Sequence, residues 1–171
     1  MLIDGYWTGA STLVAGPSGA GKTLMGLHFV FAGARLGEPS LIATVQESPV
    51  QLEYICQGFG WSLRHDNVEV MYRTPVDVYI DEWVHDVLGI VERSGTKRLM
   101  IDSLGDLMAA AGDGIRFREY VYSLLQRLSR AIAKRALWCP LWFANRPGNS
   151  ANSYYAIREP SPFRRYGTIT A

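Results

Sequence analysis

Cysteine and long apolar runs are scarce in this sequence, and each scarcity narrows the class of protein. The 171 residues include two cysteines, Cys56 and Cys139, which are far apart and form no C-x-x-C pair. This argues against a disulfide framework or a zinc site. No apolar run approaches the roughly 18 residues of a membrane span, and the start, Met-Leu-Ile-Asp-Gly, lacks a secretory pattern. We therefore expect a reduced, cytoplasmic protein without a membrane partner.

Neither sign of charge prevails in the sequence. Seventeen Lys and Arg stand against sixteen Asp and Glu, which gives a net charge of +1. This balance argues against a protein held on nucleic acid mainly by neutralising phosphates, although it leaves room for a local basic patch. With 48% hydrophobic residues, the chain suits one globular domain with a substantial core.

What the sequence does contain is a glycine-rich loop between a predicted strand and a predicted helix. Its residues fit the phosphate-binding (Walker A) pattern G-x-x-x-x-G-K-[ST]: Gly16, Pro17, Ser18, Gly19, Ala20, Gly21, Lys22 and Thr23. The glycines let the backbone wrap so that N–H groups point at phosphate oxygens, and the helix that follows favours negative charge at its start. We expect Lys22 to reach the β- and γ-phosphates, Thr23 to bind Mg²⁺ and Leu24 to complete the binding segment. The loop predicts a nucleotide-binding protein.

Strands and helices alternate along the chain. This order predicts an α/β three-layer sandwich, with a mostly parallel sheet between two layers of helices. Ligands of such folds bind at the carboxyl ends of the strands. The predicted strands cover residues 11–15, 40–45, 68–72 and 98–101, and the predicted helices cover residues 22–36, 49–57, 76–93 and 117–136.

Acidic residues follow two of these strands. Asp102 follows the strand over 98–101, where an acid usually holds Mg²⁺, directly or through water, opposite the loop threonine. Asp is also common in turns, so a turn is the alternative role. Glu47 follows the strand over 40–45 and is positioned to polarise a water for attack on the γ-phosphate. The alternative is a solvated Glu47 beside Ser48, which would cap the next helix.

Four motifs together resemble the KaiC-type branch of the RecA-like ATPases. They are T-L-V-A-G-P-S-G-A-G-K-T, A-T-V-Q-E-S-P, F-G-W-S-L and L-M-I-D-S-L, and the resemblance covers about residues 5–135. It implies a RecA-like core that binds ATP with Mg²⁺. It also implies a homo-oligomeric ring or filament, with ATP at subunit boundaries and hydrolysis coupled to signalling through protein partners.

The sequence departs from this family at the catalytic motif. The family commonly carries two adjacent glutamates after the second strand, and the first is Gln46 here. Glutamine orients a water but cannot accept its proton, so Glu47 is the remaining base, with Gln46 and Lys22 as its partners. We therefore expect slow ATP hydrolysis, or binding without turnover.

The sequence also departs from the family after Ala136. Residues 1–136 form the predicted nucleotide-binding core, whereas residues 137–171 are rich in Trp, Pro, Ser, Tyr and Arg and show no helical or strand periodicity. One hypothesis is a shifted reading frame from about residue 132–136 onward, and the other is a divergent C-terminus. The segment before the first strand is short, which favours the interpretation of this sequence as a fragment of a longer protein. The sequence of the coding DNA would decide between them.

Three other functions compete with a regulatory ATPase. A small-molecule P-loop kinase fits the length, but no convincing lid is visible. A RecA-type DNA strand-exchange protein would need DNA-binding loops, and residues 109–114 are a short segment without a basic residue, so nucleic acid is not supported as a partner. A nucleotide-dependent scaffold without turnover agrees with Gln46.

Overall fold

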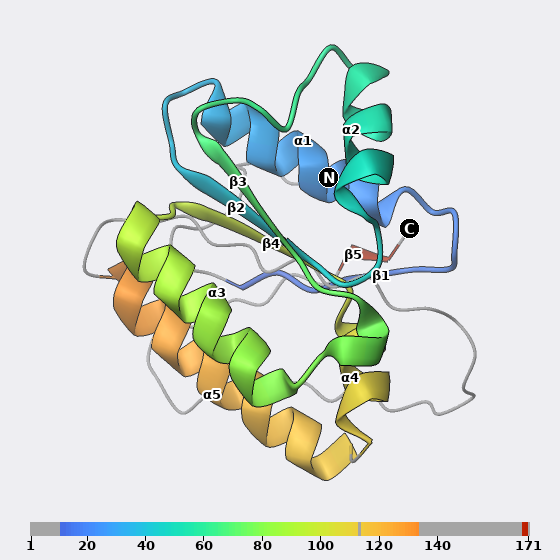
Figure 1. Cartoon of the computed structure of the whole chain (residues 1–171), viewed down its shortest axis with the longest axis vertical. Helices are drawn as coiled ribbons and strands as arrows, with labels where there is room; N and C mark the ends of the chain where they lie inside the picture. Colours follow the sequence, from blue (N-terminus) through green and yellow to red (C-terminus); the bar gives the residue numbers. More distant parts are fainter. Residues whose placement is uncertain (1–10, 113, 134–168, 171) are drawn as a thin grey trace.

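The central feature of the fold is a parallel sheet with helices on both faces. The computed structural model describes residues 11–112, 114–133 and 169–170. Three strands pair in the order β3-β2-β4, and all pairs are parallel. The strands are β2 (Ser40–Thr44), β3 (Val68–Tyr72) and β4 (Arg98–Asp102), and the main helices are α1 (Lys22–Ala34), α2 (Pro49–Gln57), α3 (Ile80–Ser94) and α5 (Gly114–Ala133). Helices α1 and α2 lie on one side of the sheet and α3 and α5 on the other, as Figure 1 shows, so the predicted α/β sandwich is confirmed.

The side chains of β2 and of β4 belong to two separate hydrophobic cores, one on each face of the sheet. Because side chains alternate across a strand, Leu41 and Ala43 join the core beneath α3 and α5, whereas Ile42 joins the core beneath α1 and α2. Strand β4 divides in the same way, with Met100 on the α1 side and Ile101 on the α3 side. Burial on both faces explains why these strands are continuous apolar runs.

The register of the strands brings their carboxyl ends level. Thr44 of β2 is paired with Tyr72 of β3 and with Asp102 of β4. The segments that leave these strands therefore emerge side by side at one edge of the sheet. This carboxyl edge holds the candidate site described below.

The structure corrects several predicted boundaries. The helix predicted over 76–93 begins at Ile80, after a short 3-10 helix, η1 (Pro75–Asp77). In the segment over 109–114, which we interpreted as a loop, residues 109–111 belong to a helix, α4 (Leu104–Ala111), and residue 114 begins α5. The Ser103 side chain accepts a hydrogen bond from the Asp106 backbone and caps the start of α4, and Gly112, at φ +69°, ends it.

A second pair of strands involves the two ends of the chain. Strand β1 (Val14–Ala15) runs parallel to β5 (Ile169–Thr170). The tail after Ala136 shows no strand periodicity in its sequence, yet β5 lies within it. Nearly all of the segment to which the hypothesis of a shifted reading frame applies, residues 134–168 and 171, lies outside the described residues. So does the segment 141–144, where a short edge strand is one interpretation of the sequence.

Within the described part of the chain, no helix is both apolar enough and long enough to cross a bilayer.

The amino end of β4 is fastened to α1 by Arg98. Its Nε bonds to Glu38 Oε2 at 2.7 Å, and its guanidinium donates to the Phe29 carbonyl at 2.9 Å and lies 4.6 Å from the centre of the Phe29 ring. A Cβ at Gly33 would overlap Arg98 Nε and Cδ. The absence of a side chain at Gly33 is therefore required for this contact.

We predict that Gly33→Ala destabilises the protein by about 1–3 kcal/mol, because the new methyl group displaces an anchored Arg98. Gly89→Ala is the matched control, since Gly89 lies inside α3 and a Cβ there would contact nothing within 4 Å. The control should stabilise the fold by about 0.5–1 kcal/mol. Urea unfolding of both variants measures these changes, and equal effects of the two substitutions would contradict the assignment.

Candidate functional site

The glycine loop presents the open N-terminus of α1 at the carboxyl edge of the sheet. Gly19 and Gly21 have φ values of +82° and +78°, which side-chain-bearing residues rarely adopt. Gly21 is the N-cap of α1, and no side chain caps this end or adds an acidic group to its first turn. Its backbone N–H groups and positive dipole end remain available to an anion.

The Lys22 ammonium folds back onto the loop. Its Nζ donates to the carbonyl oxygens of Gly16 at 2.9 Å and of Pro17 at 2.7 Å. Both acceptors are neutral, whereas phosphate oxygens are charged and form stronger hydrogen bonds with an ammonium. An incoming phosphate would therefore compete well for Lys22.

Thr23 and Asp102, which are 79 positions apart in the sequence, meet at the base of the loop. The Thr23 Oγ1 hydroxyl donates to Asp102 Oδ2 at 2.8 Å. Asp102 is 2% exposed, and its second oxygen, Oδ1, is buried without a hydrogen-bond partner among the described residues. A buried carboxylate oxygen without a partner is costly unless a ligand engages it.

The charge on Asp102 is disfavoured in the ligand-free protein. Burial raises the pKa of Asp102 above its ordinary value, and the carboxylates of Glu47 and Asp106 add to this rise. The hydrogen bond from Thr23 and the charge of Lys22 act in the opposite direction but do not offset it. A divalent cation at this position would favour the ionised form.

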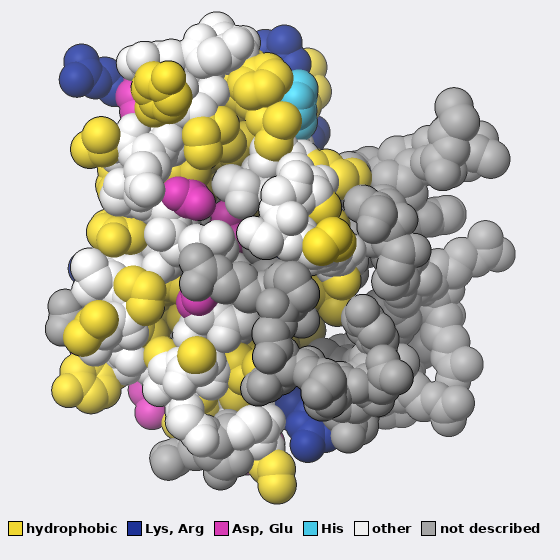
Figure 2. All heavy atoms as spheres, turned by 90° about the vertical axis from the view of Figure 1, so that its right-hand side faces the viewer, with side chains coloured by type: hydrophobic (Ala, Val, Ile, Leu, Met, Phe, Trp, Pro, Cys, Tyr) yellow, Lys and Arg dark blue, Asp and Glu magenta, His cyan; other side chains and the backbone are white. Residues whose placement is uncertain are grey.

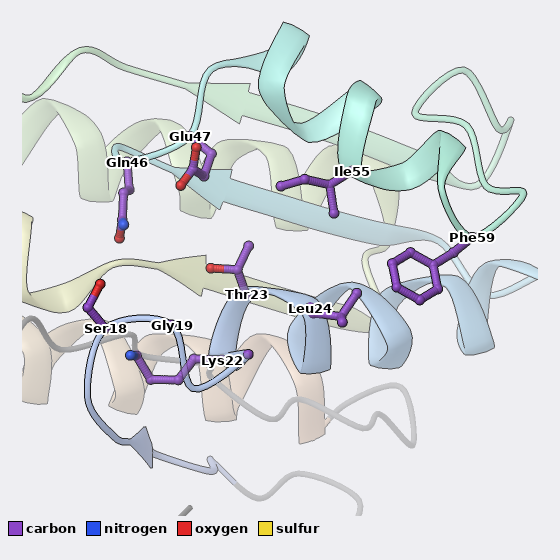
Figure 3. Close-up of a pocket in the computed structure, with 10 residues that line it drawn as sticks. Ser18, Gly19, Lys22, Thr23, Leu24, Gln46, Glu47, Ile55 and Phe59 are labelled. Carbon is purple, nitrogen blue, oxygen red and sulfur yellow. The ribbon is translucent and has the colours of Figure 1, made fainter.

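Gln46 and Glu47 lie in the turn that follows β2, across the pocket from Lys22 (Figure 3). The buried Thr44 hydroxyl organises this turn, because it accepts hydrogen bonds from the backbone N–H groups of Gln46 and Glu47, each at 3.2 Å. Among the described residues, the Glu47 carboxylate takes no hydrogen bond. It is therefore free to engage a ligand.

Ser48 caps the start of α2, as expected in the alternative interpretation in which Glu47 is solvated. Its side chain accepts from the Gln51 backbone, and the Gln51 side chain accepts from the Ser48 backbone at 2.9 Å. This capping box fixes the entry of α2. It does not use the Glu47 side chain, so Glu47 is not needed as a cap.

These elements enclose a pocket of about 310 Å³. One end is polar and belongs to the loop and the turn after β2, and the other end is apolar and belongs to α1 and α2 (Figure 3). Figure 2 views the molecule from the right-hand side of Figure 1. On this face acidic side chains lie near the middle, with hydrophobic ones around them. The lining residues are Ser18, Gly19, Gly21, Lys22, Thr23, Leu24, Gln46, Glu47, Ile55 and Phe59.

The structure therefore brings most of the predicted site residues together. Gly16, Pro17 and Ala20 shape the loop but do not line the pocket, and Asp102 lies buried behind Thr23. Sequence reasoning missed Thr44, Ile55 and Phe59. Thr44 could have been recognised as a hydroxyl two and three residues before the polar pair, a spacing that favours a side-chain turn. Ile55 and Phe59 carry no such local signal.

A glycine loop between a strand and a helix, at the carboxyl edge of a parallel sheet, defines the class of P-loop proteins. Comparison with known proteins specifies the family. The model of the KaiC ATPase family matches residues 1–137. The chain belongs to this family, and the resemblance noted from its motifs is confirmed.

Individual relatives agree with this assignment. The chain is 31% identical over 134 residues to the circadian clock oscillator protein KaiC of Parasynechococcus marenigrum, covering 70% of this chain and 26% of that protein. It is 26% identical over 133 residues to the circadian clock protein KaiC3 of a Synechocystis species, again covering 70% of this chain and 26% of the relative. The chain thus spans about a quarter of the length of these relatives.

We predict that Asp102→Asn stabilises the ligand-free protein at neutral pH, because it removes a buried charge and keeps an acceptor for Thr23. The folded protein binds the Asp102 proton more tightly than the unfolded chain, whose carboxyl has a pKa near the ordinary 3.8. The contribution of Asp102 to the free energy of unfolding is therefore fully present at pH values below 3.8. It is lost as the pH rises through the raised pKa of Asp102 in the folded protein. The difference between the variant and the parent protein should grow over the same pH interval.

Thermal unfolding at several pH values, with Mg²⁺ chelated, measures this difference. A variant that is less stable than the parent protein at neutral pH would contradict the description of Asp102.

Proposed function

We propose that this chain binds ATP with Mg²⁺ in the pocket and hydrolyses it slowly as a regulatory ATPase domain. The observation that carries this proposal is the meeting of Thr23 and Asp102 beneath an uncapped helix N-terminus. The loop donors suit the phosphates, and Lys22 can exchange two carbonyl oxygens for charged phosphate oxygens. Membership of the KaiC ATPase family supports ATP as the nucleotide.

The donors at the base of the loop fit magnesium. Mg²⁺ prefers oxygen ligands and usually takes only one or two from the protein, the remainder coming from water and phosphate. Thr23 Oγ1 and Asp102 offer such oxygens, and Asp102 Oδ1 has no other partner among the described residues. The described residues contain no cluster of three or more His, Cys, Asp or Glu side chains for a metal. When bound, Mg²⁺ would neutralise charge on the β- and γ-phosphates.

Glu47 is the proposed general base. Its side chain lines the pocket opposite Lys22, and its backbone N–H is held there by a hydrogen bond to the Thr44 hydroxyl. A carboxylate in this position can accept a proton from a water as the water attacks the γ-phosphate. Gln46 would orient that water without accepting its proton, which makes turnover slow.

A nucleotide-dependent scaffold without turnover is the second candidate function. The neutral Gln46 beside Glu47 favours it, because one carboxylate alone must then activate the water. Both functions require the same ATP complex and differ in the fate of the γ-phosphate. The hydrolysis assay below separates them.

We propose the division into a core over residues 1–136 and an atypical tail over 137–171 as well. The end of the family match at residue 137 supports this division. A homo-oligomer with the nucleotide at subunit boundaries is proposed for the complete assembly, with a protein as its signalling partner. The exposed Val50 and Tyr54, each 80% accessible on α2 beside the pocket, support such a contact.

We predict that Lys22→Ala weakens Mg–ATP binding at least tenfold, because charged hydrogen bonds are worth about 1.5–3 kcal/mol. Lys97→Ala is the matched control, since it removes the same charge at the opposite end of the sheet, next to the start of β4. Isothermal titration calorimetry on the full chain gives both affinities. The proposal fails if the unaltered chain does not bind Mg–ATP, or if Lys22→Ala binds it equally well.

We predict that Glu47→Gln lowers ATP hydrolysis about 100-fold or more, as loss of a general base does, and leaves ATP affinity nearly unchanged. Gln46→Glu should raise hydrolysis above that of the unaltered chain. Release of inorganic phosphate measures both, with Glu92→Gln on the exposed face of α3 as a control. Hydrolysis by Glu47→Gln at the rate of the unaltered chain would refute this role, and no hydrolysis by any variant would favour the scaffold.

A further inference from the structure

The position of the Glu47 carboxylate, across the pocket from the glycine loop, depends on the backbone that carries it (Figure 3). Within the described residues, the carboxylate oxygens accept no hydrogen bond. The backbone of this turn leaves β2 at Thr44 and enters α2 at Ser48. The capping box of Ser48 fixes the exit of the turn, and Thr44 fixes its entry.

The Thr44 hydroxyl makes three contacts with the turn. Its Oγ1 accepts hydrogen bonds from the backbone N–H groups of Gln46 and Glu47, each at 3.2 Å, and donates to the Glu47 carbonyl at a longer 3.5 Å. A hydroxyl has one hydrogen to donate and two lone pairs to accept with, so these contacts use its full capacity. Both backbone polar groups of Glu47 are therefore bonded to one atom.

Thr44 is itself fixed in the sheet. It is 1% exposed, and it lies on the same face of β2 as Ile42, which is the face toward α1. Its carbonyl accepts a hydrogen bond from the Arg73 backbone at 3.2 Å, and the next residue, Val45, donates its N–H to the Asp102 carbonyl at 2.8 Å. The hydroxyl thus has a constant position relative to the end of β4.

We infer that Thr44 is a positioning residue for ATP hydrolysis, because its hydroxyl holds the turn with Glu47 beside the end of β4. This inference rests on the proposed function, since it assumes that Glu47 accepts a proton from the attacking water. In that step the water oxygen bonds to the γ-phosphorus as the bond to the ADP oxygen breaks, and the water proton passes to Glu47. Thr44 does not line the pocket, so it acts through Glu47 and not on the nucleotide.

The variants separate the hydroxyl from the shape of the side chain. Thr44→Val removes the hydroxyl and keeps nearly the same size, whereas Thr44→Ser keeps the hydroxyl. Thr96→Val is the matched control, because Thr96 is a threonine of 2% exposure whose hydroxyl bonds to Ser94 Oγ at 2.6 Å, away from the pocket. If Thr44→Val does not fold, Thr44→Ala replaces it, with the same expected results.

Amide hydrogen exchange, followed by NMR on the ligand-free full chain, tests the hold on the turn. In Thr44→Val the N–H groups of Gln46 and Glu47 should exchange about tenfold faster or more, because loss of a local hydrogen bond lowers their protection. The Val45 N–H should keep its protection, since its acceptor is a carbonyl of β4. In Thr44→Ser and Thr96→Val all three groups should exchange as in the unaltered protein.

Release of inorganic phosphate from Mg–ATP tests the consequence for catalysis. Thr44→Val should lower kcat about 10- to 100-fold, the effect of a displaced catalytic group, and should leave KM within about twofold. Thr44→Ser should recover most of the rate, and Thr96→Val should not change it. Thr44→Val combined with Glu47→Gln should be no slower than Glu47→Gln alone, because Thr44 acts through that carboxylate.

The inference is overturned if Thr44→Val exchanges or hydrolyses ATP like the unaltered protein, or if Thr44→Ser or Thr96→Val loses as much. It is also overturned if the two substitutions combined lower the rate by the product of their separate effects. If the unaltered chain binds Mg–ATP but hydrolyses none, the proposed hydrolysis fails and this inference with it. If the unaltered chain hydrolyses ATP and Thr44→Val matches it, the inference alone fails.

Discussion

The hydrogen bond between Thr23 and Asp102 is the contact on which the arrangement of the site depends. It joins the first turn of α1 to the last residue of β4, and so sets the glycine loop against the carboxyl edge of the sheet. The level ends of β2 and β4 bring the turn with Gln46 and Glu47 to the same edge. This contact and the register of the strands together bring a cation, a hydroxyl and two carboxylates to one edge of the sheet.

The two ends of β4 serve opposite purposes. At its first residue, Arg98 is satisfied by Glu38, the Phe29 carbonyl and the Phe29 ring, and this end of the sheet is tightly fastened. At its last residue, Asp102 keeps a buried oxygen without a partner among the described residues, and burial raises its pKa. Stability is gained at one end and given up at the other, as is common where a protein must bind a charged ligand.

The local features of this molecule could be predicted from the sequence, and the features that depend on packing could not. The glycine loop is contiguous and its glycines have a conformational purpose, so the segment from Gly16 to Thr23 was identified in full. Strands β2 and β4 were found because burial on both faces leaves a simple apolar run. Helix α4 was missed because its alanines lie next to Gly112 and resemble a loop. The place of Phe59 could not be foreseen, because it depends on Trp61 and on the packing of α2 beside α1.

A crystal structure of the full chain with Mg²⁺ and a non-hydrolysable ATP analogue tests the central claim most directly. The expected result is a metal at about 2.1 Å from Thr23 Oγ1, with Asp102 bound to it or to one of its waters. Lys22 Nζ should then contact phosphate oxygens instead of the carbonyl oxygens of Gly16 and Pro17. An analogue bound elsewhere, or a Lys22 that keeps its loop contacts beside a bound triphosphate, would contradict the account.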